Sequence, residues 1–260
     1  MSEIDYFEMN RIGWDRRVKA HIGSAFYDVK GFLAGKTSLR EIELRELSDV
    51  AGRSLLHLQC HFGLDTLSWA RKGAICTGVD LSPVAIEQAK SLAQQTNLDT
   101  RFVCSDIYGF QRGDCNPYDI VFTSYGAVCW LPDLHRWAEV ISSNLAMGGV
   151  FYMVEFHPIH DLLAGHSYFT SKKPDVEEEG TYTENSSDAV AEFATWAHPI
   201  SNVVNALLRH GIQIEALKEF PFCPYNCFDD LEEREPGRYY RSHKGLDVPM
   251  VYSLMGRKIA

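Results

Sequence analysis

The chain has 260 residues, 45% hydrophobic and 23% charged, and its 25 basic and 35 acidic side chains give a formal net charge of −10. This composition is typical of a soluble globular protein of one large or two small domains, and it excludes disordered, collagen-like and mini-protein classes. The acid excess and the absence of a long Lys/Arg run argue against nucleic acid and anionic membranes as partners, and favour a small or cationic one.

Residues 1–50 contain helical segments and no clear strand. The first 17 residues, MSEIDYFEMNRIGWDRR, include acidic and aromatic side chains, whereas a signal peptide would begin with a basic stretch followed by an apolar one. Because no run of about 18 apolar residues occurs, we also expect no membrane span. Residues 1–50 also contain an aromatic and cationic cluster, at Trp14, Arg16, Arg17, His21, Phe26 and Tyr27.

Between residues 54 and 149, short apolar runs alternate with helical patterns. The expected strands are 55–58, 74–79, 101–104, 119–123 and 150–155, and the expected helices are 64–70, 83–95 and 134–145. Ser82 followed by proline is typical of a helix start, and Met147-Gly148-Gly149 is expected to close the third helix. This alternation predicts an α/β fold with a doubly wound, mostly parallel, Rossmann-like sheet covered by helices on both faces.

The segment 157–195 is rich in Gly, Ser, Thr and acidic residues, and its length predicts a lid or a binding element. Regular structure returns with a helix over 199–210 and strands over 212–220 and 250–257, while the acidic stretch 229–235 is expected to be solvated. We therefore predict a single domain, divided into a helical cover (1–50), a core (51–156), a lid or insertion (157–197) and a C-terminal helix and strands (198–260).

The seven cysteines are odd in number and mostly lie in apolar, strand-like surroundings, which predicts reduced, buried thiols in a cytoplasmic protein. Cys223 and Cys227 lack the two-residue spacing of zinc and thioredoxin motifs, so we expect no metal site.

The turn after the first strand, LQCHFG, is the first place to look for a site, because ligands of open α/β sheets lie at the carboxyl ends of the strands. A dinucleotide fingerprint needs G-x-G-x-x-G there, and only Gly63 is present. Asp80 ends the second strand, 21 positions after Gln59 (80 − 59), where a carboxylate can accept hydrogen bonds from ribose hydroxyls. Asp80 could instead cap the helix that begins after Ser82.

The order and spacing of these segments resemble the class I S-adenosylmethionine-dependent methyltransferases. The resemblance covers most of the chain, through LLHLQCHFGLDTL, TGVDLSPVAIEQAK, FVCSDIY, YDIVFTSYGAVCWLPDL, MGGVFYMVEFHP and TWAHPISNVVNALLRHGIQIEALKEF. The family's first motif is an acidic residue followed by three alternating glycines, whereas this chain has His57, Gln59 and His61 and keeps Gly63. It looks like a bacterial subgroup in which LQCHFG replaces the glycine-rich motif.

The resemblance implies a seven-stranded sheet that binds S-adenosyl-L-methionine. The residues it implies at the methionine end of the cofactor, largely through backbone groups, are Gln59, Cys60, His61 and Gly63. Those implied at the ribose and the adenine are Asp80, Leu81, Asp106 and Ile107, and those implied beside the sulfonium are Ser124 and Tyr125. The candidates for an N-terminal cover over the cofactor are Trp14, Arg17, His21 and Tyr27.

Several of these residues also have a structural interpretation. Asp106 can be a turn residue, and Trp14 and Tyr27 can be packing aromatics of an amphipathic helix. His57 alternates within an apolar strand and is expected to be a hydrogen-bonded core histidine. Trp130 and Trp137 are expected in the core, and Asp133 is expected to start a helix.

Methyl transfer from a sulfonium is an in-line displacement, so the protein must position, desolvate and, where needed, deprotonate the acceptor. The favoured base is His157 with Glu155 as its partner, and His198 is a further candidate. Tyr125 and Trp196 could form aromatic walls suited to a cationic amine. We expect a small-molecule acceptor with an N, O or S nucleophile. A non-catalytic S-adenosylmethionine-binding protein and an NAD-dependent Rossmann oxidoreductase remain alternatives.

Overall fold

The computed structural model describes residues 5–113, 115–184 and 186–259. In this part of the chain seven strands form one sheet in the order β3-β2-β1-β4-β5-β13-β8. The pairs β1–β2, β2–β3 and β4–β5 are parallel, and β13 is antiparallel to both of its neighbours, β5 and β8. The predicted Rossmann-like, mostly parallel α/β sheet is therefore confirmed. The chain also divides into two compact units. The first consists of Met1–Leu39, Val50–Gln111 and Lys173–Thr195, and the second consists of Arg40–Asp49, Arg112–Lys172 and Trp196–Ala260.

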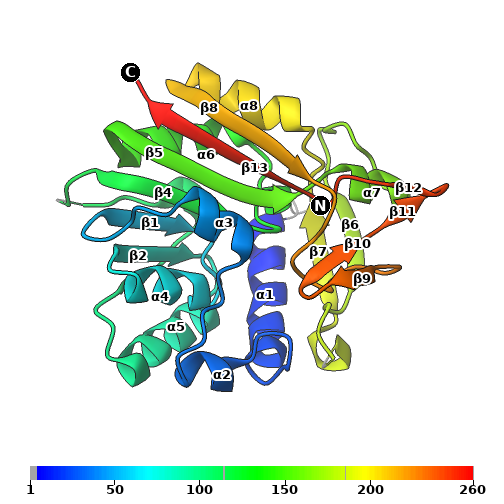
Figure 1. Cartoon of the computed structure of the whole chain (residues 1–260), viewed down its shortest axis with the longest axis horizontal. Helices are drawn as coiled ribbons and strands as arrows, with labels where there is room; N and C mark the ends of the chain where they lie inside the picture. Colours follow the sequence, from blue (N-terminus) through cyan, green and yellow to red (C-terminus); the bar gives the residue numbers. More distant parts are fainter. Residues whose placement is uncertain (1–4, 114, 185, 260) are drawn as a thin grey trace. The chain divides into compact units, whose positions relative to one another are not determined.

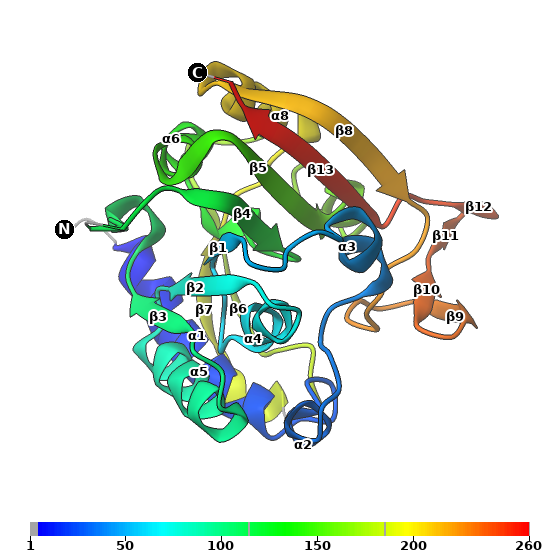
Figure 2. The same ribbon diagram turned by 60° about the vertical axis from the view of Figure 1, so that its left-hand side comes forward.

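The first unit contains three parallel strands with helices packed on them. Its elements, coloured from blue to cyan and in yellow-green in Figure 1, are α1 (Tyr6–Ile22), α2 (Val29–Leu33), β1 (Ser54–Leu58), α4 (Leu64–Arg71), β2 (Ile75–Asp80), α5 (Pro83–Thr96), β3 (Arg101–Cys104), the 3-10 turn η1 (Ile107–Gly109), β6 (Asp175–Glu179), the 3-10 turn η3 (Ser186–Ala189) and β7 (Ala191–Thr195). β2 pairs in parallel with β1 and β3, and α1 lies beside α5 (Figure 2). The predicted strands and helices of this unit are correct to within one residue at each end.

Local chemistry explains where these elements begin. The Ser82 hydroxyl accepts a hydrogen bond from Ala85 N (3.0 Å), and Pro83 occupies the first helical position, as predicted. His57 is buried in β1 and its Nδ1 lies 2.8 Å from Thr66 Oγ1, which confirms the expected core histidine. Burial lowers the pKa of His57 to about 3, so the ring is neutral at physiological pH.

The second unit carries the remaining strands of the sheet. Its elements are α3 (Glu41–Glu46), β4 (Tyr118–Ser124), the 3-10 turn η2 (Val128–Trp130), α6 (Leu134–Asn144), β5 (Leu145–Phe156), α7 (Ile159–Leu163), α8 (Ile200–Arg209), β8 (Ile212–Phe220), β9 (Glu232–Glu235), β10 (Arg238–Tyr240), β11 (Ser242–His243), β12 (Leu246–Asp247) and β13 (Val251–Lys258). Asp133 caps α6 as predicted, since its side chain accepts hydrogen bonds from the backbone of His135 and Arg136. Trp137 is fully buried, as expected, whereas Trp130 is half-buried.

The end of α6 differs from the prediction. Met147-Gly148-Gly149 does not close the helix but lies inside β5, which begins at Leu145. The pairing between β4 and β5 shifts register there, from Tyr118 opposite Leu145 to Ile120 opposite Val150. Gly148 absorbs the irregularity with a φ of 74°, a left-handed conformation that glycine adopts without strain.

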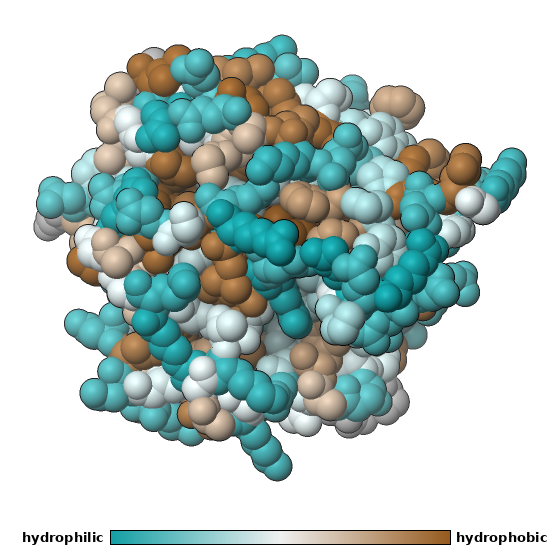
Figure 3. Space-filling view, in the orientation of Figure 1, coloured by the Kyte–Doolittle hydropathy of each residue, from teal (hydrophilic) through white to brown (hydrophobic). Residues whose placement is uncertain are grey.

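The acidic stretch 229–235 of the second unit includes the strand β9. The acidic stretch is exposed along all of β9, as expected, and Figure 3 shows hydrophilic side chains over this part of the surface. Its strand character was not predicted, because the sequence EERE shows no apolar alternation. Among the described helices, none has both the length and the hydropathy that crossing a membrane requires.

None of the seven cysteines, all of which the structure describes, forms a disulfide. Cys60, Cys76 and Cys223 are buried, but Cys104 and Cys115 are exposed, which corrects the expectation for these two residues. Cys104 is exposed because it ends β3, the edge strand of the sheet.

Candidate functional site

The turn after β1 has the backbone conformation of a glycine-rich loop although it contains one glycine. Gln59, His61 and Gly63 all have positive φ angles, of 57°, 52° and 82°. For Gln59 and His61 this left-handed conformation costs roughly 1 to 2 kcal/mol each. Gly63 has an additional constraint, because a Cβ there would lie 2.8 Å from the ring of Phe102. The chain thus keeps glycine where a side chain would collide with its neighbours, and accepts strain at the two other positions.

Asp80 connects this turn to the end of β2. One carboxylate oxygen accepts a hydrogen bond from His61 N (2.7 Å) and the other accepts one from Ser82 N (2.9 Å). Burial, with the nearby charge of Asp15, raises the pKa of Asp80 to about 6, against the opposite effect of these backbone hydrogen bonds. Each carboxylate oxygen has two lone pairs, so Asp80 can still accept hydrogen bonds from a ligand. Ser82, and not Asp80, provides the helix cap.

Asp106 and its neighbours lie beyond the next strand, β3. The Asp106 carboxylate accepts a hydrogen bond from Tyr108 N (3.1 Å) and caps η1, so the expected turn role is present. Ser105 N donates to Asp80 O (2.9 Å), which joins this turn to the end of β2. Ile107 is buried and Leu81 is half-buried.

Three of the predicted cover residues, Trp14, His21 and Tyr27, contact the turn after β1. The rings of Trp14 and Tyr27 meet the His61 ring edge to face, at centroid distances of 5.3 and 5.5 Å. Tyr27 also lies 4.9 Å from the ring of Phe62. The structure therefore brings Trp14, Tyr27 and His61 together in the first unit.

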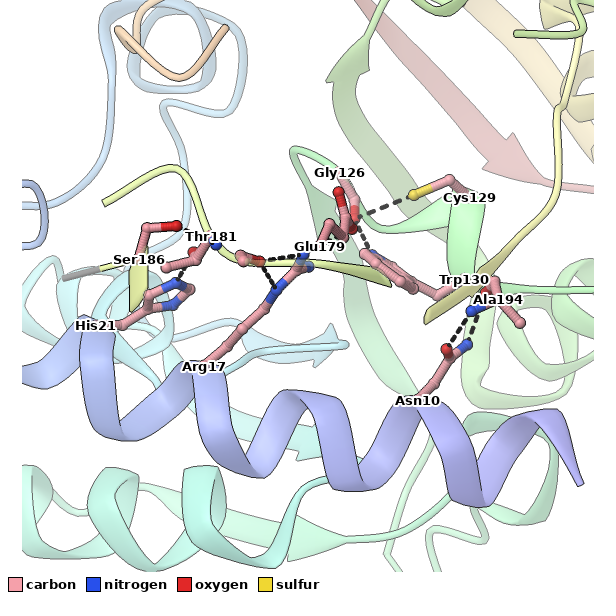
Figure 4. Close-up of polar contacts among 11 residues, drawn as sticks. Asn10, Arg17, His21, Gly126, Cys129, Trp130, Glu179, Thr181, Ser186 and Ala194 are labelled. Carbon is pink, nitrogen blue, oxygen red and sulfur yellow. Dashed lines mark hydrogen bonds and ion pairs between the residues drawn. The ribbon is translucent and has the colours of Figure 1, made fainter. Parts of the chain in front are cut away.

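The hairpin of β6 and β7 is anchored on α1, which the sequence did not reveal. The Asn10 amide donates to Ala194 O and accepts from Ala194 N, both at 2.8 Å, as a neighbouring strand would. Arg17 donates to Glu179 Oε1 (2.6 Å) and to Gly180 O (2.8 Å), and its guanidinium lies over the ring of Phe193. Figure 4 shows these side chains projecting from α1 to the hairpin. Part of the predicted lid segment thus belongs to the framework that surrounds the turn after β1.

In the second unit, Glu155 holds the turn that follows β4. Its carboxylate accepts hydrogen bonds from the N–H groups of Gly126, Ala127 (2.8 Å) and Val128 (3.1 Å), and from Phe156 N (2.7 Å). Burial raises the pKa of Glu155, while these donors lower it. Glu155 is therefore fully engaged with backbone groups.

His157 is paired with Glu219, which corrects the expected partnership with Glu155. His157 Nε2 lies 2.8 Å from Glu219 Oε1, and Nδ1 accepts a hydrogen bond from Ile159 N (3.1 Å). The pairing with Glu155 fails because β5 ends at Phe156, and the two side chains then reach different partners. Burial lowers the pKa of His157, and Glu219 opposes that change.

Tyr125 follows Ser124, the half-buried last residue of β4, and is connected to α3. Its hydroxyl donates to Glu43 Oε2 (2.9 Å), and its ring lies edge to face with Tyr225 at 5.0 Å. Burial and the Glu43 carboxylate raise the pKa of Tyr125, so its hydroxyl keeps its proton at neutral pH. Glu43 is completely buried on the short helix α3, where neither periodicity nor a motif marked it.

His198 differs from the other expected catalytic side chains. Its Nε2 donates to Leu131 O (2.7 Å), which places the lone pair on Nδ1. Nδ1 is buried and has no hydrogen-bond partner among the described residues. Burial lowers the pKa of His198, so the ring is neutral near pH 7. Nearby, buried Trp196 donates its backbone N–H to Cys129 O (2.8 Å), and the Trp130 indole donates to Gly126 O (2.7 Å; Figure 4).

One known domain family matches a segment of the chain that includes the turn after β1. Residues 55–149 match the sequence profile of the family described as "Methyltransferase domain". Over 101 residues the chain is 32% identical to ubiquinone biosynthesis O-methyltransferase of Coxiella burnetii, a match that covers 39% of this chain and 42% of that protein. The chain thus matches less than half the length of this curated relative.

Two solved structures show the same fold. One is an S-adenosylmethionine-dependent methyltransferase from Mesorhizobium loti, with a TM-score of 0.57, 21% identity, and coverage of 87% of this chain and 100% of that chain. The other is an S-adenosylmethionine-dependent methyltransferase from Clostridium acetobutylicum, with a TM-score of 0.58, 14% identity, and coverage of 100% of this chain and 94% of that chain.

Proposed function

We propose that the chain is an S-adenosylmethionine-dependent methyltransferase that acts on a small-molecule acceptor. The observation that carries the proposal is the turn after β1, inside the matched methyltransferase domain, which combines three left-handed residues with the Asp80 carboxylate. The similarity to a ubiquinone biosynthesis O-methyltransferase favours an oxygen nucleophile on a small molecule.

The residues of the first unit fit the chemistry of this cofactor. Backbone groups of Gln59 to Gly63 are proposed to face its methionine end, with Cys60 between them. Asp80 is proposed to accept hydrogen bonds from the ribose hydroxyls, since each of its oxygens retains a lone pair. Asp106 would accept a hydrogen bond from the adenine amino group, while Leu81 and Ile107 would pack on the adenine ring. When bound, the cofactor supplies an activated methyl group. Ser124 beside the sulfonium stays a prediction.

His198 is the proposed general base for an acceptor that must lose a proton. The hydrogen bond from Nε2 to Leu131 O leaves the buried Nδ1 as the acceptor atom, and the lowered pKa keeps the ring in the neutral form that a general base requires. Glu155, His157 and Tyr125 are less suited to this step, because their polar atoms already have partners.

Isothermal titration calorimetry with S-adenosylhomocysteine and with NADH tests the cofactor, and binding of NADH alone would favour an oxidoreductase. Incubation with S-adenosylmethionine and a panel of phenols, amines and thiols, followed by detection of S-adenosylhomocysteine, separates an enzyme from a non-catalytic binder. His198→Gln should lower kcat by roughly 10² to 10⁴ and leave S-adenosylhomocysteine affinity unchanged. His157→Gln is the matched control, with a much smaller effect expected on kcat. Equal losses in both variants would remove His198 from this role.

A further inference from the structure

A chain of hydrogen bonds links the hairpin segment to the turn after β1. His21 on α1 stands at its centre, with Nε2 2.5 Å from Thr181 Oγ1 and Nδ1 2.8 Å from His61 Nε2. Thr181 is itself positioned, because its N–H donates to Ser186 Oγ (3.0 Å). Figure 4 shows His21 pointing from α1 to Thr181. We call this series the Thr181–His21–His61 relay.

Both rings of the relay are neutral at physiological pH. Burial and the charge of Arg17 lower the pKa of His21 to about 3. Burial, His21 and Arg17 lower the pKa of His61 well below its ordinary value. A neutral imidazole has one N–H donor and one acceptor nitrogen, so the protons of the relay can be ordered in two directions.

The two directions give His61 opposite properties. When Thr181 donates to His21 and His21 donates to His61, the proton of His61 lies on Nδ1. When every bond reverses, His61 Nδ1 becomes an acceptor. This atom is buried and has no hydrogen-bond partner in the part of the chain that the structure describes. The direction of the hydrogen bond at Thr181 and the tautomer that His61 presents to a ligand are therefore coupled.

His61 is also a strained residue of the turn. Its φ of 52° is held by the bond from its N–H to Asp80, and its ring is held by His21, Trp14 and Tyr27. The relay thus provides fixed contacts where a glycine would provide freedom. A preformed turn loses less entropy when a ligand binds to it.

We propose that Thr181 is a positioning residue for the cofactor: acting through His21, it sets the tautomer of His61 and stabilises the turn after β1. The proposal deepens the proposed function and rests on it, because it takes S-adenosylmethionine as the ligand of this turn.

The test compares three substitutions in one segment. Thr181→Val removes the hydroxyl, Thr181→Ser restores it, and Thr183→Val is the matched control. Thr183 is buried and its Oγ1 has no partner among the described residues, so this control removes a hydroxyl without removing any hydrogen bond that the structure describes. Calorimetry gives the affinity for S-adenosylhomocysteine, and ¹⁵N spectra of labelled histidine, with His61 assigned from a His61→Gln variant, give its tautomer.

Thr181→Val should weaken S-adenosylhomocysteine binding by about tenfold and shift the ¹⁵N signals of His61, since it leaves a buried group of His21 unsatisfied. Thr181→Ser should restore both values, and Thr183→Val should match the wild type. Wild-type affinity together with an unchanged His61 tautomer in Thr181→Val would overturn the proposal.

Failure of the two proposals can be distinguished. If wild-type protein binds no S-adenosylhomocysteine, the proposed function fails, yet the His61 signals of free wild type and Thr181→Val still show whether the relay sets the tautomer. Should Thr181→Val not fold, the tautomer of wild-type His61 with and without S-adenosylhomocysteine decides, and an identical mixture in both states counts against the relay.

Discussion

Binding of S-adenosylhomocysteine should weaken as the pH falls below 6, because the proposed hydrogen bonds from the ribose hydroxyls to Asp80 favour its ionised form. In the free protein, burial raises the pKa of this carboxyl to about 6 from an ordinary 3.8. Ribose hydroxyls that donate to the carboxylate favour its charged form and therefore lower the pKa in the complex. The complex then binds fewer protons than the free protein between these two values, so acid opposes binding.

The size of the effect follows from the pKa change. If the ligand restores a pKa near 3.8, the difference of 2.2 units (6 − 3.8) corresponds to about 3 kcal/mol, or roughly a 100-fold change in Kd. Most of it should appear between pH 6 and pH 4. Asp80 affects folding with the opposite sign: the folded protein binds more protons than the unfolded chain in this interval, so acid favours folding through this group.

Calorimetry at pH 7.0, 6.0, 5.5 and 5.0 measures the change, and buffers of different ionisation enthalpy report the protons released on binding. Asp80→Asn should bind at least tenfold more weakly at pH 7, with an affinity that no longer depends on pH in this range. Glu87→Gln, which changes an exposed carboxylate on α5, is the matched control. A wild-type affinity that varies less than twofold from pH 7 to pH 5 would refute the reasoning, as would a pH dependence that persists in Asp80→Asn.

Three stability changes follow from the packing, each measured by urea unfolding. Gly63→Ala should lower the free energy of unfolding by about 3 kcal/mol, because it adds left-handed strain and a collision with Phe102. Gly52→Ala should lower it by about 1 kcal/mol, because Gly52 has a φ of 73° but lies in open space. Equal losses in the two variants would contradict the collision. Glu155→Gln should cost about 3 kcal/mol, because an amide offers one acceptor oxygen to four N–H donors; a cost under 1 kcal/mol would show that the turn does not depend on the carboxylate. Asn10→Ala should cost about 2 kcal/mol and speed proteolysis within residues 175–195, and unchanged protease resistance would argue against its role as the anchor.

The sheet was predictable because its strands are short apolar runs that end at polar residues, as Asp80 ends β2. The docking of the β6–β7 hairpin was not, since β6 reads DVEEE and is exposed along its whole length. Its position depends on contacts such as Asn10 with Ala194, which lie 184 residues apart and leave no local pattern. The predicted pairing of His157 with Glu155 was wrong for the same reason. Nothing in the sequence around His157 indicates that Glu219, on another strand, is its partner.

The turn after β1 shows why its glycine pattern is a poor guide to this site. A glycine motif indicates that the backbone is left-handed at those positions, and residues 59, 61 and 63 adopt this conformation although only residue 63 is a glycine. Gln59 and His61 together cost roughly 2 to 4 kcal/mol in strain, an amount that a few buried hydrogen bonds can offset. For His61 those bonds exist, from its N–H to Asp80 and from its ring to His21. A side chain in place of glycine is therefore compatible with an intact loop when its neighbours hold it. Asp80→Asn alters both a contact that holds the loop and the proposed ribose contact, whereas His61→Gly relieves the backbone strain at position 61, so Asp80→Asn should impair S-adenosylhomocysteine binding more than His61→Gly does.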